Sequence, residues 1–316
     1  MVGLRRKKLI YLLILLIINQ IMALLFTPLL IDYLFEEPSL IVELFAQVTT
    51  FILPVLGIFI FSSTKDESEK YQLMFKVNQL YKRPIKAKEL VIGIVVGSLI
   101  SLVVLYIINF IEVSHILVTN DYQIISNIPK FNLSIFLIAV FIFALLPAIF
   151  EELLFRGMYY DTLKTVRPKL RYLILILVFL LAHRGIMTTI SALILSVLLV
   201  YLIEKGKSLI LCVIIHFTYN LTALIFTNIV SQPLSPLRLL SNSFSDTRLV
   251  AVLFIYGGII LMIGVVVIKL LKIFTKTFNI VNLEQQQETI KLTMVEKMII
   301  GMIVGISFLF FNFYMV

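Results

Sequence analysis

The sequence predicts an all-α, polytopic membrane protein with eight or nine transmembrane helices and a central site embedded in the membrane. Hydrophobic residues make up 60% of the chain and charged residues 14%, whereas a soluble domain carries roughly 25% charged residues. Apolar runs long enough to span a bilayer recur along the chain, and the mean hydropathy is +1.07. One apolar region, residues 147–220, also holds several carboxylate, guanidinium and imidazole groups. We therefore expect a single transmembrane domain over residues 1–316, without a second soluble domain.

Nine apolar runs divide the chain into predicted membrane spans and connections. A helix rises about 1.5 Å per residue, so about 20 residues cross the hydrocarbon core, which is about 30 Å thick. The predicted spans are residues 9–35, 39–62, 90–111, 133–166, 170–183, 186–203, 208–229, 249–268 and 298–316. Residues 112–132, which include His115, form a predicted polar loop, and residues 269–297 form another polar connection. The first run follows basic residues as in a signal peptide, but its length and the lack of a small-residue cleavage site indicate a retained span.

The Lys and Arg residues fall mainly on one side of the predicted membrane. With a cytoplasmic N-terminus, 22 of the 27 lie in cytoplasmic segments, and three lie outside, at Lys130, Arg238 and Arg248. The other two, Arg156 and Arg184, lie in the motif region. This bias predicts a multi-pass protein of the cell membrane with a cytoplasmic N-terminus, and an external C-terminus if the ninth run spans. The absence of Trp and the Ile, Leu and Lys-rich usage indicate an AT-rich bacterial genome, and therefore a bacterial plasma membrane.

Composition also argues against several other kinds of site. The net charge of +9 comes from basic residues between apolar runs, where they set topology, so we expect no nucleic-acid partner. The single cysteine, Cys212, lies in an apolar run and cannot form an internal disulfide. Nothing in the sequence indicates a cysteine metal site, so we assign Cys212 to packing. Gly93 and Gly97, like Gly301 and Gly305, have the spacing of close helix contacts. We expect helix packing at both pairs, with an oligomer contact as the alternative.

Three short motifs place ionisable or amide side chains inside predicted spans. They are Glu151-Glu152-Leu153-Leu154-Phe155-Arg156, Phe179 with His183, and His216 with Asn220. A charged group at mid-bilayer costs about 2.5 to 3.5 kcal/mol even on lenient insertion scales. Chains rarely keep several such groups without a use, so the motifs indicate a catalytic or conducting site.

The turn around Arg167 allows the depths of these residues to be compared. Glu151 lies 16 residues before Arg167 and His183 lies 16 residues after it, so antiparallel helices place both at about the same height. We therefore expect the Glu151 carboxylate and the His183 imidazole to face each other. Glu152 and Arg156 are four residues apart and are expected to pair, which supports their burial. Glu151 points about 100° away from Glu152 around the helix.

The chemistry that these residues predict is hydrolysis. A carboxylate in a low-dielectric site is a good general base for water, and His183 could share or relay the proton. His216 and Asn220 lie on one helix face and could donate hydrogen bonds to an oxyanion. Glu151, His183 and His216 could instead bind zinc, with metal-bound water as the nucleophile. The sequence has no His-Glu-x-x-His helix, no Gly-x-Ser-x-Gly turn and no suitable pair among its five aspartates, which argues against other protease chemistries.

The three motifs, in this order, resemble those of the CAAX prenyl protease and bacteriocin-processing family, also called Abi. That family carries Glu-Glu-x-x-x-Arg, Phe-x-x-x-His and His-x-x-x-Asn, and the resemblance covers about residues 130–230. It implies an intramembrane endopeptidase of glutamate type that needs no cofactor. By this likeness Glu151 and His183 activate water, and His216 and Asn220 form the oxyanion site. In a bacterium the resemblance implies leader or pheromone processing, bacteriocin self-immunity, or shedding of a surface-protein segment.

Other interpretations of the same residues stay open. Glu151, Glu152 and Arg156 could form a structural ion network, and His216 and Asn220 could serve helix packing. The chain could scaffold or regulate a partner membrane protein without catalysis, or transport ions, because intramembrane Glu and His also mark proton paths. As a protease, its partners would be the lipid bilayer and a membrane-associated peptide or protein substrate. The sequence leaves the substrate, the oligomeric state and the use of metal open.

Overall fold

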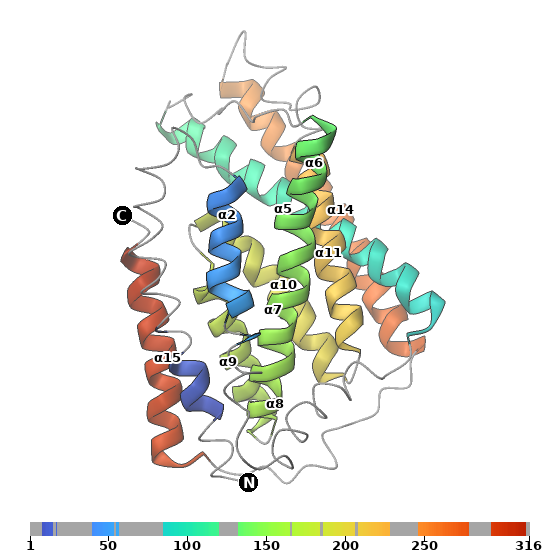
Figure 1. The fold of residues 1–316 in the computed structure, drawn as a ribbon. Coiled ribbons are helices and arrows are strands. Elements are labelled where there is room, and N and C mark those ends of the chain that lie inside the picture. The colour runs from blue at the N-terminus through green and yellow to red at the C-terminus, as the bar shows by residue number, and fades with distance from the viewer. Residues whose placement is uncertain are drawn as a thin grey trace. The chain divides into compact units, whose positions relative to one another are not determined.

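The computed structural model is helical throughout the residues that it describes. These are residues 8–14, 17, 40–53, 55–56, 85–119, 132–164, 166–183, 186–205, 208–227, 246–277 and 292–313. Every regular element within them is a helix, which confirms the predicted all-α class (Figure 1). In lipid, a helix satisfies all its backbone hydrogen bonds internally, which explains why apolar runs adopt this structure.

The chain divides into two compact units, each described by itself. Unit 1 contains Met1–Lys86, Leu146–Val213 and Ile280–Val316, and unit 2 contains Ala87–Leu145 and Ile214–Asn279. The predicted single transmembrane domain stays a prediction.

Four helices in the described residues are long and apolar enough to cross a membrane. They are Ala87–His115, Leu133–Leu163, Met187–Glu204 and Val250–Lys272, and Leu209–Ile225 is a shorter apolar helix. All five fall on predicted spans. The predicted total of eight or nine spans stays a prediction, since most of residues 9–35 lie outside the described part of the chain.

One long helical run carries the first motif. It consists of α6 (Leu133–Val140), η2 (Phe141–Leu145), α7 (Leu146–Glu152), η3 (Leu153–Tyr159) and α8 (Tyr160–Leu163). The side-chain oxygen of Asn132 caps its start by accepting a hydrogen bond from Ile135 N at 2.8 Å. The turns η2 and η3 are π-helical. Because the ring of Pro147 would collide in an α-helix with the carbonyl of Phe143, which lies in η2, we attribute η2 to this proline.

Two helices extend further than predicted. Residues 112–119 were expected in a polar loop, but α5 (Ala87–Thr119) continues through them, with Val113 fully buried. The Ser114 hydroxyl donates to Phe110 O at 2.7 Å, so the helix itself satisfies this polar group. His115 is therefore an exposed helical residue and not a loop residue. Likewise α14 (Asp246–Thr277) continues past the predicted end at residue 268, because lysine is a good helix former and its ammonium group can reach solvent.

Unit 1 contains further helices within the described residues. They are α2 (Leu40–Gln47), η1 (Val48–Ile52), α9 (Pro168–Leu181), α10 (Ile186–Glu204), the beginning of α11 (Leu209–Ile225), and α15 (Met294–Phe313). Pro168 occupies the first turn of α9, where its fixed φ favours a helix start. At the start of α15, Thr293 N donates to Glu296 Oε2 at 2.7 Å and Glu296 N donates to Thr293 Oγ1 at 3.3 Å, a reciprocal cap. Helix α9 packs against both α10 and α15.

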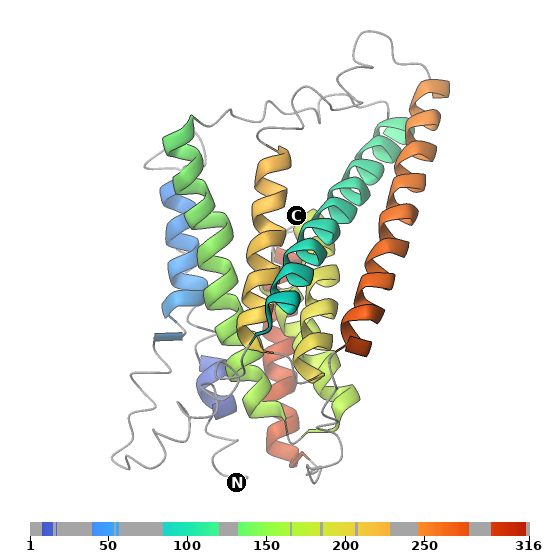
Figure 2. The same ribbon diagram turned by 90° about the vertical axis from the view of Figure 1, so that its right-hand side faces the viewer.

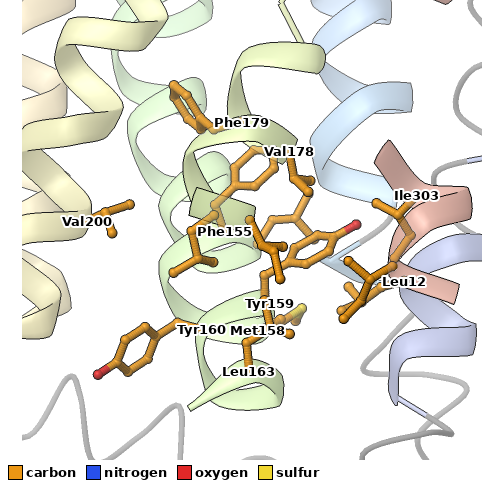
Figure 3. Packing of buried hydrophobic residues seen from close by; sticks show 14 of the residues in the cluster. Leu12, Phe155, Met158, Tyr159, Tyr160, Leu163, Val178, Phe179, Val200 and Ile303 are labelled. Carbon is orange, nitrogen blue, oxygen red and sulfur yellow. The ribbon is translucent and has the colours of Figure 1, made fainter. Parts of the chain in front are cut away.

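Phe155 lies at the centre of the buried cluster of unit 1 (Figure 3). Its ring centroid lies 6.2 Å from that of Phe51, 5.8 Å from that of Tyr159 and 5.0 Å from that of Phe179. Leu12 and Ile303 belong to the same cluster, so residues near both ends of the chain pack on η3. Because lipid is as apolar as these side chains, van der Waals packing and not the hydrophobic effect is the driving force here.

Arg171 fastens the start of α9 to the end of α10. Its Nε and Nη2 donate to the two carboxylate oxygens of Glu204, and its Nη1 donates to the carbonyl oxygens of Lys164 and Val166. The two charged side chains are only 7% and 10% exposed. This one guanidinium therefore neutralises a carboxylate and satisfies carbonyls of the turn between α8 and α9.

In unit 2, α5 and α14 pack side by side (Figure 2). The rings of Tyr106 on α5 and Tyr256 on α14 are tilted against each other with centroids 5.6 Å apart. Large apolar side chains of α14 are exposed, among them Phe254 at 78% and Leu261 at 73%. Such exposure is expected of a helix that faces lipid.

The Arg171–Glu204 pair provides a test of how unit 1 is held together. Arg171→Leu leaves the Glu204 carboxylate and two carbonyls without this donor, so we expect the free energy of unfolding to fall by about 3 kcal/mol. Thermal unfolding of the purified protein in detergent measures the change. The control is Arg167→Leu, which removes an exposed arginine four residues earlier. Equal midpoints for the two variants would contradict a stabilising role for the pair.

Candidate functional site

Glu151 and Glu152 end α7, and both are buried, with 3% and 0% of the residue exposed. The next residues belong to η3, which positions Arg156. Burying a carboxylate requires compensation by opposite charge or hydrogen bonds. The two neighbouring carboxylates contact different partners, because adjacent side chains point in different directions around the helix.

Glu152 is held by Arg156, as the motif spacing predicts. Arg156 Nη1 donates to Glu152 Oε1 at 2.9 Å, and both side chains are 0% exposed. Arg156 Nη2 donates to Ser196 Oγ of α10 at 3.1 Å. The guanidinium carbon lies 4.2 Å from the ring centroid of Phe179, a cation–π distance. The Glu152 carboxylate therefore neutralises the charge of Arg156, and the Ser196 hydroxyl and the Phe179 ring stabilise the guanidinium further.

His183 follows the last turn of α9 and is oriented by Phe179. His183 Nδ1 lies 2.8 Å from the carbonyl oxygen of Phe179, and the two rings have centroids 4.7 Å apart. A carbonyl oxygen can only accept, so Nδ1 carries a hydrogen in this arrangement. The other ring nitrogen, Nε2, is then directed at Glu151.

Glu151 and His183 come together in unit 1. His183 Nε2 lies 3.8 Å from Glu151 Oε2, and the side chains are 23% and 4% exposed. This confirms the prediction, made by counting outward from Arg167, that the two side chains face each other. The separation exceeds an ordinary hydrogen bond, so one water at about 2.8 Å from each atom could contact both. Their catalytic roles stay a prediction.

His216 and Asn220 lie one turn apart on α11, in the part of this helix that belongs to unit 2. His216 is 3% exposed and Asn220 is half-buried. The predicted convergence of these side chains with Glu151 and His183 stays a prediction. The start of α11, in unit 1, packs on α10: Cys212 is buried, and its thiol donates to Leu199 O at 3.9 Å.

Ser196 is the residue of this site that the motifs did not reveal. It is wholly buried on α10, and its hydroxyl oxygen accepts a hydrogen bond from Arg156 Nη2. The available signal was weak: Ser196 is a polar residue within an apolar predicted span, residues 186–203. Serines are common in transmembrane helices, so only the fold shows that this one meets the guanidinium.

The described residues contain no group of three or more His, Cys, Asp or Glu side chains arranged to hold a metal ion. In unit 1, Glu151 and His183 supply two candidate ligands. The zinc alternative also needs His216, which belongs to unit 2, so the use of zinc and the expected independence from cofactors both stay predictions.

The apolar helices, with a buried carboxylate that faces an imidazole, define a helical membrane protein with ionisable groups inside its spans. Residues 133–222 match the family model described as "Type II CAAX prenyl endopeptidase Rce1-like". This segment includes all three motifs, and the match confirms the resemblance to the CAAX prenyl protease family. The family implies a peptidase that acts on a membrane-associated substrate. No curated protein and no solved structure matched the chain.

Ser196→Ala tests whether the Ser196 hydroxyl helps to hold the buried Arg156 side chain. The change leaves a buried guanidinium nitrogen without its hydroxyl partner, so we expect the free energy of unfolding to fall by about 1 to 3 kcal/mol. Thermal unfolding in detergent is the measurement. In the control, Ser114→Ala, the lost hydroxyl donates to a carbonyl oxygen of its own helix, that of Phe110. A Ser196→Ala midpoint that matches this control would show that Arg156 does not depend on Ser196.

Proposed function

We propose that this chain is an intramembrane endopeptidase that hydrolyses a peptide bond in a membrane-associated peptide or protein with water activated by Glu151 and His183. The observation that carries the proposal is the 3.8 Å separation between Glu151 Oε2 and His183 Nε2, inside the segment that matches the endopeptidase model. A buried carboxylate that faces a partly exposed imidazole is an arrangement typical of catalytic sites.

Glu151 acts as the general base in this proposal. A water between Glu151 and His183 gives a proton to the Glu151 carboxylate while its oxygen attacks the peptide carbonyl carbon. The carbonyl π electrons move to oxygen and form an oxyanion. When the C–N bond breaks, the proton passes to the leaving amine, either from Glu151 or through His183. The cycle returns both groups to their starting protonation states.

The pairing of Glu152 with Arg156 supports this division of roles. The 2.9 Å ion pair already occupies the Glu152 carboxylate, so that group is a poor base for water. The Glu151 carboxylate faces the imidazole of His183, with Oε2 3.8 Å from Nε2. Of the two neighbouring carboxylates, Glu151 is therefore the one suited to accept a proton.

His216 and Asn220 form the proposed oxyanion site. Their spacing of four residues on α11 puts both side chains on one face of that helix, where an imidazole N–H and an amide N–H can donate to the same oxygen. The family model that matches residues 133–222 covers both His216 and Asn220, which supports their part in the proposed site.

The setting that we propose is a bacterial plasma membrane with the N-terminus in the cytoplasm. The excess of Lys and Arg in the segments assigned to the cytoplasm supports this orientation. Substrates would then be leader peptides, pheromone precursors or surface-protein segments that reach the site from the lipid.

Glu151→Gln tests the proposed base. The amide keeps the size of the side chain but cannot accept the proton, so we expect cleavage to fall by at least about 100-fold at normal protein level. Comparative peptidomics of cells that express wild-type or variant protein measures the loss. His183→Ala should give a similar loss.

His115→Ala is the matched control, because His115 is an exposed histidine on α5, and we expect an unchanged peptidome. If Glu151→Gln leaves both the peptidome and the phenotype unchanged, the chain is a scaffold or regulator. Flux that depends on pH in proteoliposomes, lost in Glu151→Gln, would instead show a transporter.

The zinc alternative is tested with the purified protein. In our proposal the carboxylate itself activates water, so we expect cleavage of a peptide from the peptidomic comparison to persist after extensive chelation. Elemental analysis should show zinc well below one equivalent. Stoichiometric zinc in the wild type that is lost in Glu151→Gln would replace the general-base mechanism with metal-bound water.

A further inference from the structure

In unit 2, α5 crosses α11 (Figure 2). Gly97 of α5 lies at this contact. A Cβ built at Gly97 would overlap Thr218 Oγ1 and would lie 2.6 Å from the carbonyl oxygen of Ile215. Real Cβ atoms essentially never approach a neighbouring atom this closely. The missing side chain therefore lets the backbone of α11 approach α5 closely, which confirms helix packing as a role of Gly97.

Polar contacts fix the crossing in register. Thr222 Oγ1 donates to Ser98 Oγ at 3.1 Å, one residue after Gly97 on α5 and one turn after Thr218 on α11. The Thr218 hydroxyl donates back to the Ile214 and Ile215 carbonyl oxygens at 2.9 and 3.1 Å. Such back-bonding satisfies a buried hydroxyl within the helix and lets the threonine lie flat against the glycine.

The crossing also determines which face of α11 is turned away from α5. Ile215, Thr218 and Thr222 form the contact face, and at about 100° per residue the side chains of His216 and Asn220 are centred about 150° away from it. A displacement of α11 relative to α5 would therefore also displace His216 and Asn220, which lie on the opposite face of α11.

Five other glycines of the described helices do not show this crowding. A Cβ at Gly257, Gly258 or Gly264 of α14, or at Gly301 or Gly305 of α15, would meet nothing within 4 Å among the described residues. Helix α5 is restrained by its packing against α14, which includes the contact between Tyr106 and Tyr256. A side chain added at Gly97 would therefore displace α11.

We propose that Gly97 is a positioning residue that sets the distance and rotation of α11 on α5 and thereby places His216 and Asn220 for their role in the reaction. The inference rests on the proposed function for that role, whereas the seating of α11 on α5 is independent of it. Gly97 does not touch the substrate. It acts through the backbone of Ile215 and the side chain of Thr218.

The activity test compares Gly97→Ala with Gly264→Ala, the same change on a neighbouring helix of unit 2 where the space is open. Using a peptide from the peptidomic comparison, we expect Gly97→Ala to lower kcat roughly 10- to 100-fold, because small displacements of catalytic groups have effects of this size. We expect KM to stay within about twofold, since an oxyanion site acts mainly on the transition state. Gly264→Ala should match wild type.

A second change distinguishes positioning from general damage. In Gly97→Ala/Thr218→Ala the overlap with Oγ1 is removed while the contact with the Ile215 carbonyl remains, so kcat should recover in part. A fall in kcat that Thr218→Ala does not relieve at all, together with loss of folded protein, would show that Gly97 is needed only for stability.

A cross-link tests the seating without reference to activity. In a Cys212→Ser background, which has no native cysteine, Ser98→Cys with Thr222→Cys should form a disulfide under mild oxidation, because the native oxygens are 3.1 Å apart. Adding Gly97→Ala should slow this cross-link severalfold, and adding Gly264→Ala should not.

The outcomes separate the two proposals. Unchanged cross-linking in the presence of Gly97→Ala would show that Gly97 does not set the position of α11 on α5. Slowed cross-linking with an unchanged kcat would show that this position does not matter for the reaction. A wild-type protein without peptidase activity would refute the proposed function, and with it the role in the reaction, while the cross-link still decides whether Gly97 sets the position of α11.

Discussion

The burial of a full ion pair inside the helices is the constraint on which the rest of the site depends. Glu152 and Arg156 are wholly inaccessible to solvent and 2.9 Å apart. Neither charge could be buried alone, because the free energy needed to desolvate an unpaired ion exceeds the stabilisation from packing. The surrounding helices supply what the pair needs: α10 contributes the Ser196 hydroxyl, and α9 contributes the face of Phe179.

Phe179 connects this ion pair to the carboxylate–imidazole pair. Its ring covers the Arg156 guanidinium, while its backbone carbonyl oxygen lies 2.8 Å from His183 Nδ1. The rotation of α9 that buries the ring against Arg156 therefore also determines where His183 Nε2 points. One residue thus couples the electrostatics of the first motif to the orientation of the second.

The two units hold their polar residues by different physical means. In unit 1, opposite charge and hydrogen bonds hold Glu152 and Arg156, and Glu151 faces His183. Phe179 of the buried cluster (Figure 3) packs against Arg156. In unit 2, the helix that carries His216 and Asn220 is seated by close backbone approach at Gly97. This contrast is physically reasonable, because helices in lipid gain little from apolar burial and associate through small-residue contacts or polar bonds.

The sequence by itself determined the features that depend on local periodicity. Hydropathy predicted the helical class and the places of the main spans, and the four-residue spacing of Glu152 and Arg156 predicted their ion pair, because residues one turn apart are neighbours in any helix. Counting from the turn at Arg167 predicted that Glu151 faces His183, because antiparallel neighbours share a height. The polar loop predicted around His115 was wrong, since hydropathy marks where a membrane ends and not where a helix ends.

Only the tertiary structure decided the contacts between helices that are distant in sequence. The position of Ser196 against Arg156, forty residues apart, depends on the rotation of α10, and one apolar span gives no clue to that rotation. The same holds for the ring of Phe179 over Arg156, for the tie between Arg171 and Glu204, and for the seat of α11 at Gly97. These contacts follow from how whole helices pack, which depends on shape at every position along both surfaces, whereas spacing within one helix follows from backbone geometry alone.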